Sequence, residues 1–480
     1  MESEFLALQT AANALATSQM YLDVTGQNIA NSSTDGYSRQ RLTTVSMGPD
    51  IGGEKFVSGD PRVGRGVCVT GVQQVRDNYL DNRYRTANSD SSFYDELSDS
   101  LSQIEDIFNE FGNSKLTGLS GQLSTLVSNM KKLQASPNDG NLASNVCESM
   151  KSVCQIVKSD YNQLVQLSNQ VKGNLSSTVT GKQKDGGVNT VLQNISSLNK
   201  QIASYEIGGQ TANDLRDQRN KLLDQLSSDL GIDVNEQKNG MVTVALKGGT
   251  QMLIDSTNTI NELSMSSDGT KVQFADASEA KISGGSIGAD LEIINGDGTG
   301  AGDYGELGIP AMEKMLDTFA KGFVTAVNKV ATNNGVSGEN LLSGTSATTF
   351  SISSDWQNDD TLIVKNYAGS DTGNYIAQFV TMFNQKDLIS LNSGTIQDYA
   401  DSISMSIAYR NNYIGGTGGL ADSSDAITKN IKQQRQAVSG VSVNEETVNI
   451  VKYQQSYNAA AKVISVINEM LQTLINCVSA

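Results

Sequence analysis

Residues that could carry chemistry are scarce in this sequence, because none of its 480 residues is histidine. Ser-His-Asp catalysis, Cys-His catalysis and histidine-ligated zinc are therefore excluded. One stretch imitates a calcium loop: residues 295–300 read Asn-Gly-Asp-Gly-Thr-Gly, and Glu306 stands at the twelfth position. The Asn at the first position and the Thr at the fifth depart from that pattern. We expect a flexible Gly-rich connector here, with calcium binding as the alternative, and we predict no catalytic residue, cofactor or metal site.

Four cysteines, Cys68, Cys147, Cys154 and Cys477, form neither a CxxC unit nor a dense disulfide pattern. Cys147 and Cys154 are seven residues apart, which places them on one face of a predicted helix but too far apart along it for a disulfide. We expect the cysteines to be small buried thiols rather than metal ligands.

The formal net charge of −17 argues against nucleic acid or an anionic membrane as a partner, because both are bound through clustered Lys and Arg. No apolar run approaches 18 residues, so we expect no membrane insertion. The first residues, Met-Glu-Ser-Glu, lack the basic segment that opens a secretory signal. If the protein is exported, we therefore expect a route without a cleaved signal peptide.

The elements that must position any functional residue begin with a long heptad helix near the C-terminus. Ser442 followed by Glu445 predicts a capping box at its start, and no Gly or Pro interrupts it afterwards. From Val443 to Val478 it would be roughly 54 Å long. Its apolar side chains follow a full a/d pattern, with Val443, Ile450, Tyr457, Ile464, Leu471 and Val478 in one row and Tyr453, Ala460, Ile467 and Leu474 in the other.

A second heptad helix is predicted near the N-terminus. Leu8, Leu15, Leu22 and Ile29 repeat at seven, with Phe5 and Ala12 as a second row until Gln19 interrupts it. We expect the two helices to pack on each other and on other copies of the chain, and the alternative is an intramolecular pair that closes one domain. The expected assembly contacts are Leu8, Leu15, Leu22, Ile29, Ile450, Tyr453, Tyr457, Ile464, Ile467, Leu471 and Leu474.

Between these ends, helical periodicity predicts helices over residues 78–112, 117–135, 142–175, 187–206, 213–230, 307–333 and from 396 onward. Short β runs are predicted at 241–246, 252–254, 263–265 and 272–274, with a second strand-rich stretch at 349–364. The fold class is mainly α with an inserted β-rich domain. We expect terminal arms at 1–30 and 441–480, a helical stem at 31–231, 284–333 and 396–440, an outer β domain at 232–283 and a variable segment at 334–395.

After the first helix the chain reads Asn28-Ile29-Ala30-Asn31-Ser32-Ser33-Thr34-Asp35-Gly36-Tyr37-Ser38-Arg39-Gln40. Asn31 can end the helix, and Asp35-Gly36 suits a tight turn that needs positive φ. The segment resembles the N-terminal signature of bacterial flagellar rod, hook and hook-associated proteins, although Gln27 and Ser33 replace two customary asparagines. The motif residues carried by this resemblance are Asn28, Ala30, Asn31, Thr34, Gly36, Tyr37, Arg39 and Gln40.

The C-terminal arm is similar to the same family over Ser439–Glu446, Tyr453–Tyr457, Ala461–Ser465 and Leu471–Leu474. Residues 214–219, Asp-Leu-Arg-Asp-Gln-Arg, and the Gly-Gly-Ser-Ile-Gly at 284–288 also resemble internal landmarks of the family's junction subunits. The resemblance implies a structural subunit that joins hook to filament, exported unfolded to the extracellular flagellum. It implies contacts with further copies, the hook protein, another junction protein and, indirectly, flagellin, and an export chaperone on the C-terminal arm.

Two other classes of function stay open from the sequence. A rod or hook subunit would share both terminal motifs. A calcium-binding or adhesive surface protein would use the loop at 295–306 or the outer domain, but the single Trp356 is more typical of a core residue than of a ligand site.

Overall fold

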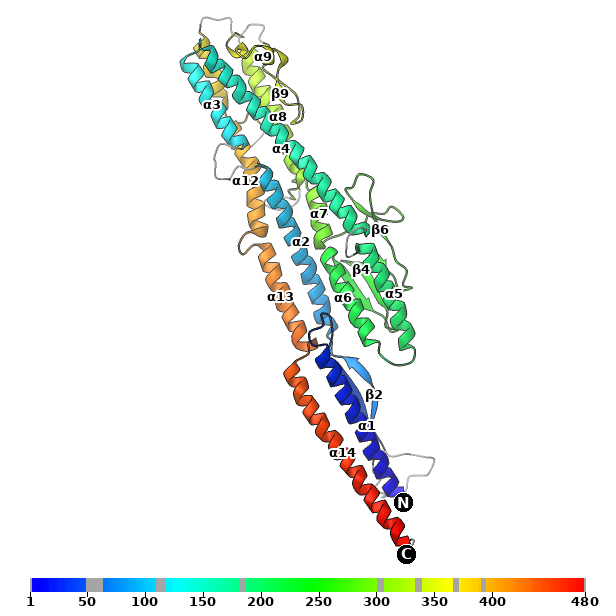
Figure 1. Cartoon of the computed structure of the whole chain (residues 1–480). Helices are drawn as coiled ribbons and strands as arrows, with labels where there is room; N and C mark the ends of the chain where they lie inside the picture. Colours follow the sequence, from blue (N-terminus) through cyan, green and yellow to red (C-terminus); the bar gives the residue numbers. More distant parts are fainter. Residues whose placement is uncertain are drawn as a thin grey trace.

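The computed structural model describes residues 2–48, 64–108, 118–181, 186–299, 306–332, 339–365, 371–389 and 394–478. It is a long rod with both chain ends at one tip (Figure 1). The helices are α1 Glu2–Ala30, α2 Asn78–Phe108, α3 Leu119–Ala135, α4 Gly140–Thr180, α5 Val188–Glu206, α6 Asn213–Asp229, α7 Gly285–Asn295, α8 Ile309–Thr332, α9 Ser354–Asn358, α10 Leu362–Lys365, α11 Thr372–Asn384, α12 Ile396–Gly415, α13 Leu420–Ser439 and α14 Val443–Val478. The mainly α fold with an inserted β-rich region is confirmed, whereas the domain boundaries stay a prediction.

The terminal arm consists of α1, α14 and a two-stranded antiparallel hairpin of β1 (Gln40–Met47) and β2 (Gly66–Gln74) that packs along α1. Helices α1 and α14 run antiparallel (Figure 1): Tyr21 stacks on Tyr453 with ring centroids 4.4 Å apart, and Asn28 lies 3.4 Å from Glu446. The two terminal helices therefore pack on each other, as predicted. Contacts with other copies stay a prediction.

The second row predicted on the N-terminal helix is wrong. Phe5 is 75% exposed, and the buried residues lie one position earlier in the heptad, at Ala11, Ser18 and Thr25. The reason is that α1 packs against the β1–β2 hairpin as well as α14, so small and hydroxyl side chains allow close approach. Leu8, Leu15, Leu22 and Ile29 are half-buried.

The stem holds one contiguous apolar core along α2 to α8, α11 and α12. It is lined, for example, by Leu97, Leu101 and Ile104 of α2, all nearly inaccessible to solvent. Among the described residues, this core includes no residue of α1 or α14. The arm is therefore attached to the stem by something other than shared hydrophobic packing.

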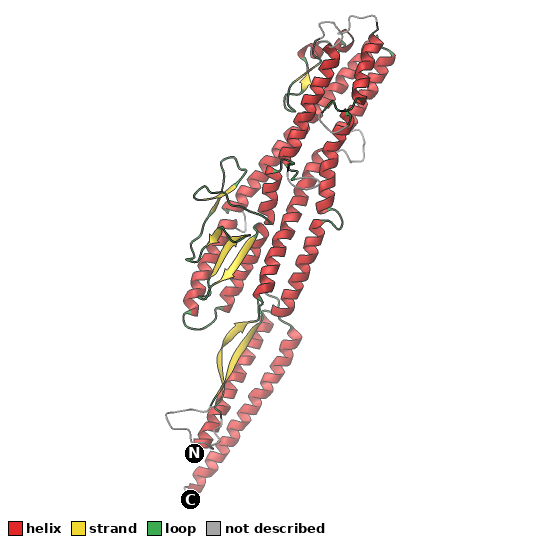
Figure 2. Ribbon diagram, turned by 180° about the vertical axis from the view of Figure 1, so that it is seen from behind, coloured by secondary structure: helices red, strands yellow, loops and turns green. Residues whose placement is uncertain are grey.

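The inserted β region lies against the side of the stem, next to α5 and α6 (Figure 2). Strands β3 (Ile232–Glu236), β4 (Val242–Leu246) and β5 (Met252–Ile254) form one antiparallel sheet, and β6 (Leu263–Met265) pairs with β7 (Val272–Phe274). The first of these strands was not predicted, because three of its five residues, Asp233, Asn235 and Glu236, have low β propensity. Asn199 and Arg219 hold the region to α5 and α6 through buried hydrogen bonds to Val242 and Gly240.

The stretch predicted as strand-rich at 349–364 holds only one two-residue strand, and half of its residues are helical, which corrects the sequence prediction. Only β8 (Leu342–Ser343) and β9 (Ser351–Ile352) pair there, and α9 and α10 follow. Ser353 caps α9 by accepting from the amide of Trp356, so a local hydroxyl cap outweighs the β propensity of the neighbouring residues. Trp356 is fully buried, as expected of a core residue.

The expectation that all four cysteines are buried also changes. Cys147 and Cys154 are buried, and burial raises the pKa of their thiols to about 11 and about 12, but Cys68 and Cys477 are exposed. The calcium-like stretch lies partly outside the described residues. Among the residues that the structure describes, no group of three or more Cys, Asp or Glu side chains is placed to hold a metal ion, and no helix could span a membrane.

Candidate functional site

The candidate functional site is the joint, where residues 31–40 and the starts of α2 and α14 meet α6 and the end of α13. Its first part is a clamp made by Asn28, which is 1% exposed. The Asn28 amide donates to the Gln40 carbonyl at 2.9 Å, while its oxygen accepts from the Gln40 amide at 2.9 Å and the Tyr37 hydroxyl at 3.0 Å. These bonds fold the motif loop back onto the end of α1.

Arg39 connects this loop to the C-terminal arm. Its backbone amide donates to the Ser439 carbonyl at 2.8 Å, and its guanidinium contacts Glu445 at 3.0 Å and Glu446 at 2.8 Å. The predicted capping box is therefore only half formed. The Ser442 hydroxyl lies 3.5 Å from the Glu445 amide, but the Glu445 carboxylate binds Arg39 instead of closing the box.

A second group of contacts joins the loop to the stem. Both the amide and the hydroxyl of Ser38 donate to Asp217 of α6, at 3.0 and 2.6 Å. Arg76, which stands between β2 and α2, donates to Ser38 and Asp217 and also binds both oxygens of Asp81, at 2.9 and 3.0 Å. Burial raises the pKa of the Asp217 carboxyl, although Ser38 and Arg76 act against that shift. The carboxylate therefore depends on these partners for its charge.

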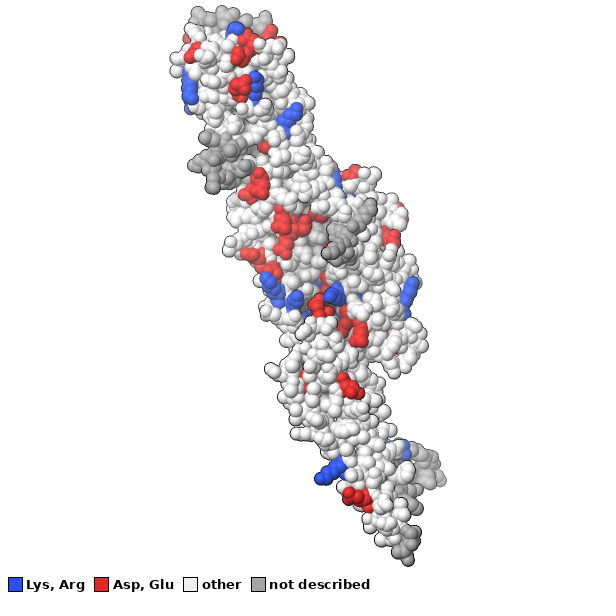
Figure 3. All heavy atoms as spheres, viewed as in Figure 1, with Lys and Arg blue, Asp and Glu red and all other residues white. Residues whose placement is uncertain are grey.

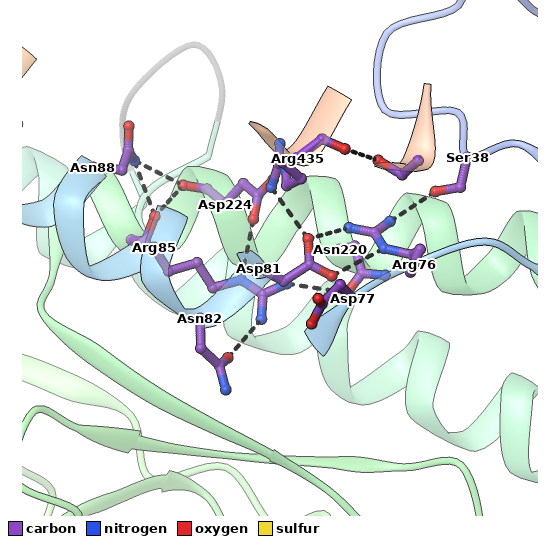
Figure 4. A network of polar contacts seen from close by, with 12 residues as sticks. Ser38, Arg76, Asp77, Asp81, Asn82, Arg85, Asn88, Asn220, Asp224 and Arg435 are labelled. Atoms are coloured by element: carbon purple, nitrogen blue, oxygen red, sulfur yellow. Dashed lines mark hydrogen bonds and ion pairs between the residues drawn. The ribbon is translucent and has the colours of Figure 1, made fainter. Parts of the chain in front are cut away.

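The third group lies where α2, α6 and α13 converge (Figure 4). Asp224 of α6 accepts from Arg85 of α2 at 3.1 Å and from Arg435 of α13 at 2.6 Å. Arg85 is 5% exposed, and burial lowers its pKa despite the neighbouring carboxylates. The Arg435 guanidinium also lies 4.0 Å from the centre of the Tyr84 ring.

Comparison with known proteins decides the family. The model of the flagellar hook-associated protein FlgK helical domain matches residues 101–341, and models of flagellar basal body rod proteins match residues 8–37 and 432–477. Flagellar hook-associated protein 1 of Bacillus subtilis is 30% identical, over 99% of this chain and 99% of that protein. This chain belongs to the hook-associated protein 1 family. The Salmonella typhimurium protein of that name is 23% identical over 97% of this chain and 98% of that protein.

Some of the predicted motif residues lie in the joint of this hook-associated protein, and others lie outside it. Asn28, Tyr37, Arg39 and Gln40 all take part in its hydrogen bonds. Gly36 has φ +87°, as the turn required. The other three motif residues lie outside the network: Ala30 and Thr34 are exposed, and the Asn31 side chain bonds only to its own helix end and to Thr34.

Sequence reasoning missed most stem residues of the joint in this family member. Arg76, Asp81, Arg85, Asp224 and Arg435 gave no signal, because they are spread over three distant segments and become neighbours only in the fold. Of the stem carboxylates, Asp217 was within the noted 214–219 landmark, where the Asp-x-x-Asp spacing could have indicated a shared helix face.

The predicted assembly contacts of α14 lie on two sides of the helix, one facing α1 and one exposed to solvent. Ile467 is 4% exposed, and Ile450, Tyr453, Tyr457, Ile464 and Leu471 are half-buried, all on the α14 stripe that faces α1. Leu474 is 45% exposed, as are other apolar residues of α14 outside the predicted seam, namely Val448, Val451, Val463, Val466, Met470 and Ile475 at 44–68%. Most of the seam is thus used within the chain, and a second apolar stripe remains open.

Proposed function

We propose that this protein is a structural subunit of the bacterial flagellum at the junction between hook and filament. The observation that carries the proposal is family membership along the whole chain, 30% identity over 99% of both proteins. The long rod-like fold suits a building block of a larger assembly. In this role the subunit assembles on the distal hook and provides a seat for further junction subunits and, indirectly, for flagellin.

The physical arrangement supports this role. Outside the seam with α1, α14 exposes several apolar side chains, among them Val448, Val451, Val463, Val466 and Met470, and exposed apolar surface indicates an interaction site. We infer that this stripe packs on neighbouring copies while the seam with α1 stays inside each subunit. The joint then fixes the direction in which the arm leaves the stem.

Deleting the gene in its source bacterium tests the function. Electron microscopy of the cells should show complete hooks without filaments, and flagellin should be found in the medium. Wild-type protein supplied from a second copy should restore filaments. Missing hooks would assign the protein to the rod or hook instead, and normal filaments would overturn the proposal.

We further propose export without a cleaved signal peptide, with a chaperone covering the C-terminal arm beforehand. The same apolar stripe that packs between copies would need cover in the cytoplasm. Mass spectrometry of the assembled protein should find the N-terminal Met-Glu-Ser-Glu sequence or only its initiator Met removed. An N-terminus shortened further would contradict export without cleavage. Full-length protein used as bait should capture a small partner protein, and the double variant Val463→Asp with Val466→Asp should capture less of it. Equal capture by both proteins would contradict a chaperone on this arm.

A further inference from the structure

Three large side chains form an exposed stripe on α12, here called the α12 stripe. Met405, Tyr409 and Tyr413 are 56%, 58% and 60% exposed. Their four-residue spacing makes them neighbours on one face of the helix, whereas Ile403 and Ile407 are buried on the face toward the stem core. Tyr and Met are enriched in the buried centres of protein interfaces. The α12 stripe is therefore a candidate contact surface of the stem.

The surface around the α12 stripe carries almost no charge. Between Asp401 and Asp422 the only charged residue is Arg410, which is buried and binds Glu292. The chain as a whole has a formal charge of −17, and Figure 3 shows acidic side chains gathered over the middle of the stem. Two copies of so acidic a chain repel each other least where their surfaces are uncharged, whereas a basic partner would be drawn to the acidic surface. The lack of charge thus favours a second copy as the partner.

A second exposed apolar group lies at the turn between α5 and α6, here called the α5–α6 knob. Ile207 is 87% exposed and Tyr205 is 54% exposed. This region is uncharged in the same way, because the only charged residue within 201–213 is Glu206, whose carboxylate binds Arg216 at 2.7 and 2.9 Å. Figure 1 shows α12 and α5 on opposite sides of α2. Each copy therefore carries two uncharged apolar surfaces, one on each side of the rod.

The size of the α12 stripe indicates what kind of contact it can make. With about 200 Å² of surface for each large side chain, its three residues offer roughly 350 Å². A stable interface between free proteins buries about 800 Å² on each partner. The α12 stripe is thus too small to hold a free partner, but it suffices for a neighbour that another contact already keeps in place.

We propose that the α12 stripe of one copy packs against the α5–α6 knob of a second copy that lies beside it. Because the two surfaces differ and lie on opposite sides of the rod, the contact is heterologous and can repeat from copy to copy around a tube. Contacts between arms bring the copies together, and this contact then aligns their stems. The inference rests on the proposed function and adds to it a contact that does not involve the arm.

Site-directed cross-linking in cells that lack their own copy of the gene tests the contact. The parent variant carries Cys68→Ser with Cys477→Ser, which removes both exposed thiols. The test variant adds Tyr413→Cys with Ile207→Cys. The matched control adds Lys429→Cys with Ile207→Cys, because Lys429 is exposed on α13, outside the α12 stripe. Isolated hooks with their attached filaments are treated with a short bifunctional maleimide.

The test variant should form dimers and a ladder of longer species, about tenfold more than the control, because neighbours held in place react at an effective concentration that chance encounters do not reach. Tyr413→Cys alone and Ile207→Cys alone should form none, since neither surface meets its own kind. The test variant in purified, unassembled form should not cross-link either, because the contact is too small to hold two free copies.

A charge placed in the α12 stripe gives a second measurement. Met405→Lys with Tyr413→Lys should lower the fraction of hooks that carry filaments by about tenfold, because each contact would then bury unpaired charge. Gln163→Lys with Gln166→Lys, both exposed on α4, is the matched control and should match wild type. Circular dichroism melting curves and the amount of exported protein identify any variant that fails to fold or to leave the cell.

Cross-linking of the test variant no stronger than that of the control, in cells that do carry filaments, would overturn the contact. Dimers from either single cysteine, or normal filaments with the lysine variant, would also overturn it. These results are distinct from failure of the proposed function, because wild-type protein would still be needed for filaments in the same strain. If filaments grew without the protein, the function itself would be wrong.

Discussion

Replacing Asp224 by Ala should loosen the joint more than any exposed substitution, because Asp224 of α6 holds α2 and α13 together at the end of the stem where the motif loop bonds to Ser439. Asp224 binds Arg85 at 3.1 Å and Arg435 at 2.6 Å, and its side chain is 18% exposed. Removing one partner of a buried ion pair typically costs about 3 to 5 kcal/mol, since a buried charge is left uncompensated.

The expected value is at the lower end of that range. Arg85 keeps a hydrogen bond to Asn220 at 3.1 Å, and Arg435 keeps Asp81 at 3.6 Å and the Tyr84 ring. We therefore expect a loss of about 3 kcal/mol, which corresponds to roughly a hundredfold faster local opening.

Amide hydrogen exchange is the appropriate assay, because a chain with several cooperative units has no single free energy of unfolding. Exchange should accelerate at the Ser38 and Arg39 amides, whose acceptors lie across the joint, and stay unchanged in the stem core. Asp425→Ala is the matched control, since its ion pair with Lys429 is exposed and contributes at most about 1 kcal/mol. Equal, small effects from both variants would refute the idea that this network holds the joint.

Three other perturbations have expected outcomes. Burial, with a contribution from Glu96, raises the pKa of Asp290 to about 8, so the folded stem should lose stability as pH rises from about 4 to about 8, by up to about 5 kcal/mol; Asp290→Asn should flatten that dependence in thermal melts. Gly36→Ala should destabilise the joint by about 1 kcal/mol because its φ is +87°, whereas Gly26→Ala, inside α1 with open space around it, should stabilise the helix by a similar amount in the same melts. Ile467→Asp should separate α14 from α1, measured as lost helical signal, while the same change at the exposed Leu474 should leave the monomer intact; equal losses would contradict the assignment.

The helices and strands of this protein were predictable from sequence where a single hydrophobic pattern determines the element. The α14 helix runs from Val443 to Val478 as its heptads and its start signal predict, and the strands between Met252 and Phe274 are the short β runs predicted between turn residues. Prediction failed where a third element intervened. The second row on α1 moved from Phe5 and Ala12 to Ala11 and Ser18, because the β1–β2 hairpin, absent from the heptad argument, also packs on that helix.

The candidate site could be predicted only on the side that the family resemblance covers. Asn28 and Arg39 are in a recognisable motif, whereas Arg85 and Arg435 are ordinary surface residues until α2 and α13 bring them to Asp224. Buried ion pairs between distant segments have no local period, so hydrophobic patterning cannot indicate them. The sequence showed the charged residues of the 214–219 landmark, two Asp and two Arg, but not their partners.

The contacts at the joint also indicate a role for the motif residues within the subunit. Asn28 and Arg39 direct their side-chain contacts to residues of the same chain, to Tyr37 and Gln40 in one case and to Glu445 and Glu446 in the other. A side chain whose donors are already satisfied inside the subunit gains little by binding a neighbour. We therefore expect the motif to act by orienting the arm, and we expect contacts between copies to involve the exposed apolar side chains of α14 instead. It follows that motif substitutions should misdirect the arms of subunits that still fold, a defect that extra protein would not overcome.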